Sequence, residues 1–127
     1  MVDIKIAENS IGWLRFILED KSFNVSYLSD FIEEMRELLD LHDDCTHDKE
    51  VHRIYLDGEG NDLYLTAWRE YRTLYVVWEN YNEEDKADLK IMQFNYNDFM
   101  KEFNDKFETI KKNYYSLFDI DENKYNN

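Results

Sequence analysis

The sequence predicts an α+β domain in two layers, in which an antiparallel sheet of about six strands carries two helices mainly on one face. The first observation is a set of three runs, 51–56, 62–68 and 72–78, in which apolar and polar residues alternate. Their connections are short, which is typical of an antiparallel meander. The second observation is helical spacing of apolar residues near 30–41 and after residue 97. Strands and helices in this order build a sheet with helices on one side.

Outside the meander, alternation of apolar and polar residues predicts strands over 2–6 and 22–27. Residues 13–19 are denser in apolar side chains, which suits a strand buried on both faces. A tight connection at 20–21 then makes a hairpin of 13–19 and 22–27. Residues 87–94 are predicted as a last strand, whose register the sequence does not fix.

Both helices are predicted from apolar residues at helical spacing. The first runs from about Asp30 to Leu41, with Ser29 or Asp30 as its N-cap. The second begins near Asn97 or Asp98. Its apolar stripe consists of Phe99, Phe103, Phe107, Ile110, Tyr114 and Leu117.

The central meander is predicted to have one core face and one amphipathic face. Turns at 58–59 and 70–71 pair Leu63 with Ile54 on one side and with Trp78 on the other. The core face then consists of Ile54, Leu56, Leu63, Leu65, Leu74, Val76 and Trp78. The opposite face consists of Val51, Arg53, Tyr55, Tyr64, Thr66, Trp68, Thr73, Tyr75 and Val77.

The amphipathic face is rich in aromatic residues, and Tyr and Trp are the side chains that most often anchor protein interfaces. We therefore expect a partner-binding surface that includes Tyr55, Tyr64, Trp68 and Tyr75. The alternative is that this face is covered by the N-terminal strands or by a terminus.

Acidic residues are predicted to gather at one end of the same sheet. Alternate connections of a meander lie at the same end, so the turn after residue 57 and the loop at 81–86 are neighbours. The acids of this rim are Asp57, Glu59, Asp62, Glu79, Glu83, Glu84, Asp85 and Asp88. We expect no comparable basic group beside Asp57, Glu59, Asp62, Glu83, Glu84 and Asp85, which makes these six candidates for contact with a basic partner. The alternative is a solvated rim.

Length and charge narrow the class of protein. The chain has 127 residues and a net charge of −14, from 15 basic and 29 acidic residues. This predicts a single domain over 1–118 and an acidic, frayed tail over 119–127. The charge disfavours nucleic acid and membrane surfaces as partners, because both are anionic. One cysteine and the lack of a signal-like apolar run favour a cytoplasmic protein.

The candidate metal ligands His42, Cys45, His47 and His52 cluster within eleven positions. Their spacing matches no standard zinc site, and His52 falls on the predicted core face. We therefore expect no metal and no other cofactor. No nucleophile, acid/base pair or glycine-rich phosphate loop stands out by its spacing, so the sequence predicts a protein that is not an enzyme.

The segments DLYLTAW, TLYVVWENY and FNYNDFMKEF, with the size, charge and order of elements, resemble the small acidic immunity proteins that bacteria encode beside polymorphic secreted toxins. The resemblance implies a tight one-to-one complex that neutralises a basic toxin, often a nuclease. Two other readings stay open. A homo-oligomeric adaptor, such as a homodimer, accounts for the aromatic face, and a phage-type inhibitor that mimics nucleic acid accounts for the acids.

Overall fold

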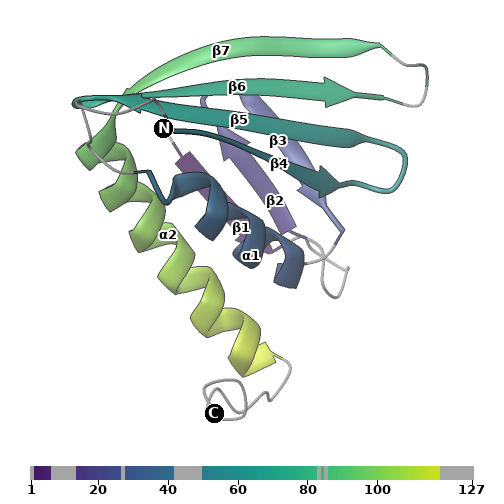
Figure 1. Cartoon of the computed structure of the whole chain (residues 1–127). Coiled ribbons are helices and arrows are strands. Elements are labelled where there is room, and N and C mark those ends of the chain that lie inside the picture. Colours follow the sequence, from purple (N-terminus) through teal and green to yellow (C-terminus); the bar gives the residue numbers. More distant parts are fainter. Residues whose placement is uncertain are drawn as a thin grey trace.

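The computed structural model describes residues 2–6, 14–26, 28–41, 50–82, 84 and 86–117. Its elements, in chain order, are β1 (Val2–Ile6), β2 (Leu14–Leu18), β3 (Lys21–Val25), α1 (Leu28–Leu39), β4 (Val51–Asp57), β5 (Asp62–Glu70), β6 (Thr73–Tyr81), β7 (Ala87–Asn95) and α2 (Tyr96–Leu117) (Figure 1). The α+β class is confirmed, and all strand pairs are antiparallel. The strands form two sheets, β1-β2-β3 and β4-β5-β6-β7, where the sequence analysis expected one.

The two sheets stack because each has one apolar face. In β2 only alternate residues, Leu14, Phe16 and Leu18, are buried, so the expectation of a strand buried on both faces is wrong. Phe16 lies against Trp78 of β6, with 6.1 Å between ring centroids. Stacking buries both apolar faces at once, whereas joining the sheets edge to edge would leave each face to be covered by helices alone.

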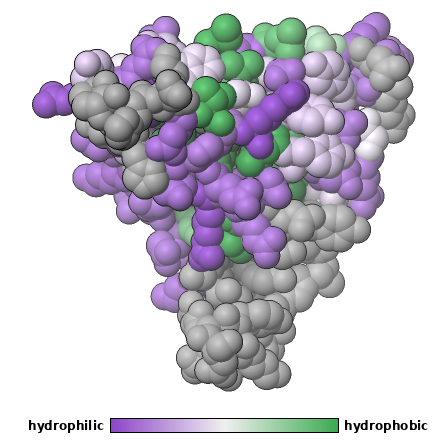
Figure 2. Space-filling view, viewed as in Figure 1, coloured by the Kyte–Doolittle hydropathy of each residue, from purple (hydrophilic) through white to green (hydrophobic). Residues whose placement is uncertain are grey.

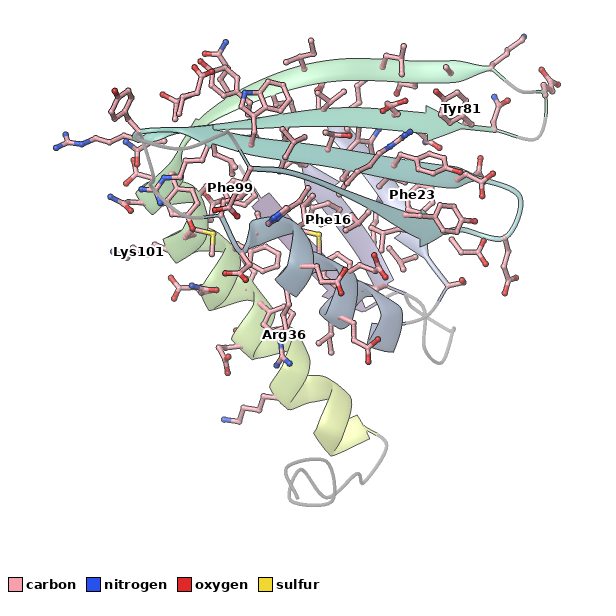
Figure 3. All side chains as sticks on the ribbon, in the orientation of Figure 1. Phe16, Phe23, Arg36, Tyr81, Phe99 and Lys101 are labelled. Atoms are coloured by element: carbon pink, nitrogen blue, oxygen red, sulfur yellow. The ribbon has the colours of Figure 1, made fainter. Side chains whose placement is uncertain are left out.

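Both helices lie on one face of the four-stranded sheet, as predicted, and β1–β3 lie on the same side (Figure 1). Phe31 of α1 packs 5.2 Å from Phe16, measured between ring centroids. In α2 the described members of the apolar stripe, Phe99, Phe103 and Phe107, are all buried. Figure 3 shows Phe16 and Phe99 beneath the four-stranded sheet. The core is therefore a sandwich of this sheet on one side and a small sheet with two helices on the other.

The register of the meander differs from the prediction by two residues at both pairs of strands. Leu63 lies opposite Leu56 and Asn80, where the sequence analysis expected Ile54 and Trp78. Because side chains alternate with a period of two, a shift of two residues leaves every side chain on its predicted face. The predicted core face is accordingly buried throughout.

The turns explain the shift. The β4–β5 connection has four residues and is closed by the Gly58 N–H, which donates to the Asn61 carbonyl at 2.9 Å. Glu59 and Gly60 take positive φ angles of 52° and 105° within it. The β5–β6 turn falls one residue later than predicted and places Tyr71 at φ 53°. Only glycine adopts such angles without cost, so Glu59 and Tyr71 hold locally strained backbone.

Both helices begin one or two residues before their predicted starts. The first begins at Leu28 and ends at Leu39, which places Ser29 and Asp30 inside its first turn rather than at the cap. The second begins at Tyr96, because the Asn95 side chain accepts a 3.0 Å hydrogen bond from the Asp98 N–H and so acts as its N-cap. Neither correction changes the face that each helix buries.

Ser26 joins the two halves of the fold. Its backbone N–H and its hydroxyl both donate to the Asp57 carbonyl, at 2.9 and 3.0 Å. This buried serine therefore has its polar groups satisfied and fixes the end of β3 against the end of β4. Trp13, Tyr27, residues 42–49 and the predicted tail 119–127 lie outside the described residues.

An open aromatic face as candidate functional site

The side of the four-stranded sheet opposite the core is called here the open face. In the described part of the chain both helices and the other sheet lie on the far side of it (Figure 1). Its larger residues are Val51, Arg53, Tyr55, Tyr64, Thr66, Trp68, Tyr75, Val77, Glu79, Tyr81, Leu89 and Ile91. The alternative of a face covered by β1–β3 is therefore wrong, because those strands pack on the core face.

A tyrosine cluster occupies one half of the open face. Tyr64 in β5 lies between Tyr55 and Tyr81, with ring centroids 5.2 and 6.0 Å away. The guanidinium carbon of Arg53 lies 4.7 Å from the centroid of the Tyr64 ring, within the range of a cation–π contact. Tyr81 stands at the end of β6 (Figure 3). Three rings and a guanidinium thus form one contiguous surface.

Hydrogen bonds fix the outer rings of the tyrosine cluster. The Tyr55 hydroxyl donates to Asp62 at 2.6 Å, and the Tyr81 hydroxyl donates to Glu79 at 3.0 Å. Each bond to a carboxylate raises the pKa of its tyrosine, since ionisation would lose the bond and place two negative charges together. Partial burial raises the Tyr55 pKa further. Arg53 also lies 3.6 Å from Glu79, so the cluster is held from both sides.

A second aromatic pair lies toward the other end of the sheet. Trp68 and Tyr75 are direct cross-strand partners, and their rings stack with centroids 5.2 Å apart and planes 8° from parallel. Thr66 and Val77 pair between this stack and the tyrosine cluster. All four predicted aromatic residues therefore share the open face, and they fall into two groups of rings.

Apolar side chains extend the open face to β7. Leu89 and Ile91 are 61% and 67% exposed. Figure 2 shows hydrophobic side chains along the top of the molecule, where β7 lies. Leu89 and Ile91 are not among the predicted site residues, because the sequence does not fix the register of 87–94. Tyr81 is not among them either, although it continues the alternation of Tyr75, Val77 and Glu79 beyond the predicted end of the strand.

The acidic rim is brought together as predicted within the described residues. The connections after β4 and after β6 lie at the same end of the sheet (Figure 1), and Asp57 pairs with Asp62 across β4 and β5. Asp57 also accepts the backbone N–H of Glu59 at 2.9 Å, which orders the turn. Glu83 and Asp85 lie outside the described residues.

The expectation that no basic group accompanies the candidate acids is wrong for Glu84. The Lys86 ammonium lies 3.3 Å from its carboxylate. Asp88 is likewise paired, with Lys21 of β3 at 2.8 Å. Lys21 reaches the rim end of the four-stranded sheet because β1–β3 stack on that sheet, an arrangement that the sequence did not predict. Asp57, Glu59 and Asp62 remain the acids of the rim for which the described residues show no ion pair.

Of the candidate metal ligands only His52 belongs to the described residues. Its Nδ1 lies 3.3 Å from the Leu38 carbonyl and its Nε2 lies 3.5 Å from Glu50. These contacts are those of a half-buried structural histidine between α1 and β4. No group of three or more potential metal ligands occurs among the described side chains. His42, Cys45 and His47 lie outside them.

No protein-family model matches the chain, and neither the curated proteins nor the solved structures contain a match to it. In the ranges that the structure describes, neither helix has the length and apolar character needed to cross a membrane.

Proposed function

We propose that this chain is a non-catalytic binding protein whose open face receives a protein partner, and that the partner is basic. The observation that carries the proposal is the open face itself. It holds two groups of aromatic rings and three exposed aliphatic side chains, Val51, Leu89 and Ile91. A composition of Tyr, Trp and Arg with few aliphatic residues is typical of the energetic centre of protein interfaces.

The aromatic groups are pre-organised for binding. Tyr64 is flanked by two rings and by Arg53, and Trp68 is stacked on Tyr75. The outer tyrosines are also held by hydrogen bonds to Asp62 and Glu79. Side chains that are already ordered lose little rotamer entropy when a partner docks, so more of the contact energy appears as affinity.

Charge supports a basic partner. The chain carries a net charge of −14, and the acids of the rim other than Glu79, which lies opposite Tyr64, stand at the edge of the tyrosine cluster rather than at its centre. Charges at the rim of an interface act chiefly on the rate of encounter and on the choice of partner. The same charge disfavours nucleic acid and anionic membranes as ligands.

An immunity protein that neutralises a basic toxin, such as a nuclease, is the specific form of this proposal. It accounts for the aromatic face and for the acids together, and it fits a cytoplasmic location. A mimic of nucleic acid requires the acids but gives no role to the tyrosine cluster or to the stack of Trp68 on Tyr75. The homo-oligomeric reading is supported by a different part of the sheet, β7.

The proposal is tested with the candidate toxin encoded beside the gene of this chain. Association and dissociation rates are measured by surface plasmon resonance for the wild type and for the double variant Glu59→Lys/Glu84→Lys. The matched control is Glu33→Lys/Glu37→Lys, which makes the same change of charge on the exposed side of α1. We expect the rim variant to associate about tenfold or more slowly at low salt, with a smaller change in dissociation.

The control variant is expected to associate at a rate close to that of the wild type. High salt should remove most of the difference in association rate between the rim variant and the wild type. Equal slowing by both variants would show that only net charge matters and that the rim is not near the partner. A candidate toxin that neither binds nor loses activity in the presence of the chain would contradict the immunity proposal.

A further inference from the structure

The outer edge of β7 offers unpaired backbone groups. Two hydrogen bonds fix the phase of the β6–β7 ladder: Asn82 N–H to Lys86 carbonyl at 3.1 Å, and Tyr96 N–H to Arg72 carbonyl at 2.6 Å. Counted along the ladder, the pairs 82–86 and 72–96 both lie an even number of residues from the pair Trp78–Lys90. In an antiparallel ladder hydrogen-bonded and non-bonded pairs alternate.

It follows that the even-numbered residues of β7 bond to β6, and that the odd-numbered residues direct their N–H and C=O groups outward. Leu89, Ile91 and Gln93 are the central members of the outward set. None of the described strands pairs with this edge, since β7 is the last strand of its sheet. A nine-residue strand with a free edge is a template for pairing with another strand.

The side chains that usually protect such an edge are engaged elsewhere. Charged residues on an edge strand disfavour pairing with another chain. In β7 these are Asp88 and Lys90, which form ion pairs with Lys21 and Asp20 of the other sheet. The outward residues Leu89 and Ile91 instead present apolar side chains that are more than half exposed. This edge therefore combines free hydrogen-bonding groups with apolar surface.

We propose that the free edge of β7 pairs with β7 of a second copy of this chain, antiparallel about a twofold axis near Ile91. The two four-stranded sheets then form one sheet of eight strands. Ile91 of one copy then forms a hydrogen-bonded pair with Ile91 of the other on the open side, and each Leu89 lies opposite Gln93 of the other copy and diagonally beside its Ile91.

Charge favours the antiparallel orientation. The start of β7 adjoins the acidic rim, and its end adjoins the β5–β6 turn, where Arg72 is exposed. Antiparallel pairing sets the acidic end of each copy beside the Arg72 end of the other. Parallel pairing would bring the two acidic rims together, which like-charge repulsion opposes.

The dimer does not depend on the proposed function. The tyrosine cluster and the stack of Trp68 on Tyr75 belong to β4, β5 and β6, so pairing through β7 leaves them uncovered. Each dimer would present two such surfaces on one continuous sheet.

Sedimentation velocity over a range of concentrations tests the proposal with the wild type, Ile91→Lys and Val51→Lys. Val51 is the matched control, because it lies on the same face, is 55% exposed and belongs to the opposite edge strand, β4. We expect a dimer for the wild type and for Val51→Lys. Ile91→Lys should raise the dissociation constant about tenfold or more, since each dimer loses two apolar contacts and brings two like charges together.

Amide hydrogen exchange of the wild type gives a second readout that needs no variant. In a dimer the amides of Leu89, Ile91 and Gln93 gain protection as concentration rises, while those of Lys90 and Met92 are protected at every concentration. A wild type that stays monomeric at high concentration would overturn the proposal. So would a dimer in which the amides of Leu89, Ile91 and Gln93 exchange freely, because it would use another surface.

Discussion

The two faces of the four-stranded sheet share one backbone and differ in almost every side chain. On the core face Leu56, Leu63, Leu65, Leu74 and Trp78 show no exposure at all. On the open face the same strands carry rings, hydroxyls, Arg53 and Glu79, which contact one another and are half-buried or exposed. The core face is apolar and buried, as folding requires, whereas the open face is arranged in a way that folding does not require.

The core face stabilises the fold, whereas the open face remains available for a partner. Burial of apolar surface is the main source of stability, and nearly all of it lies on the core face. The contacts on the open face are ring pairs and hydrogen bonds that are exposed or partly buried, each of which contributes less. Substitutions on the two faces should therefore have opposite consequences for stability and for binding.

The largest difference is expected between neighbours in β5. Leu65→Ala should lower the free energy of unfolding by about 2–5 kcal/mol, because it opens a cavity in the core. Thr66→Ala, one residue along on the open face, should lower it by at most about 1 kcal/mol, as strand propensity alone changes. Urea denaturation of both variants measures the contrast, and equal losses would show that the open face is packed as tightly as the core.

Gly58 lies where the β4–β5 turn packs against β3. Its substitution is expected to cause the second-largest loss of stability. A Cβ placed there would lie 2.6 Å from the Phe23 ring and 2.9 Å from the Asn24 carbonyl oxygen. The ring can turn aside but the backbone oxygen cannot, so Gly58→Ala should cost about 1–3 kcal/mol of stability. Thermal unfolding would reveal it. An unchanged melting temperature would mean that the two sheets are not held together at this point.

Tyr55 gives the open face a dependence on pH. The bond to Asp62 raises its pKa in the folded state above the ordinary value of about 10. The bond therefore stabilises the fold fully below pH 10 or so, and the stabilisation is lost as pH rises above it, since the unfolded state ionises first.

Tyr55→Phe should lower stability by less than about 1 kcal/mol at pH 8, because the bond is exposed. The difference between Tyr55→Phe and the wild type should shrink as pH is raised beyond 10. Denaturation at several pH values measures both. A difference that does not change with pH would indicate that the hydroxyl is not bonded to a carboxylate in solution.

The smallest effect is expected at Tyr71, in the turn between β5 and β6. Its φ of 53° is costly for tyrosine, and its side chain is 68% exposed. Asparagine tolerates this conformation better, so Tyr71→Asn should raise the free energy of unfolding by up to about 1 kcal/mol. Chemical denaturation would detect the gain. A loss of stability would instead show that the exposed ring makes a contact important to the fold.

The sequence predicted which residues share a face better than it predicted which residues are partners. Alternation determines the face of each strand residue, and every core residue assigned in the meander is buried. Register depends on the turns, and the four-residue loop at Gly58–Asn61 moved Leu63 from Ile54 to Leu56 without changing its face. An error in the position of a turn therefore changes the predicted strand partners but not the predicted faces.

Contacts between residues far apart in the sequence could not be predicted from local sequence patterns. The division into two sheets depends on how β2 packs over Trp78, and no spacing in the chain encodes that contact. The ion pair of Lys21 with Asp88 follows from the same stacking and joins residues 67 positions apart. The apolar surface of Leu89 and Ile91 was also missed, because it required the register of β7.

The central claim is that the open face binds a protein while the core face holds the fold. The most direct test measures Tyr64→Ala and Tyr75→Ala twice, once for affinity toward the toxin encoded beside the gene and once for the free energy of unfolding. We expect each variant to weaken binding by about 1–3 kcal/mol and to remain folded. Undiminished affinity of both variants for a toxin that the wild type binds tightly would contradict the claim.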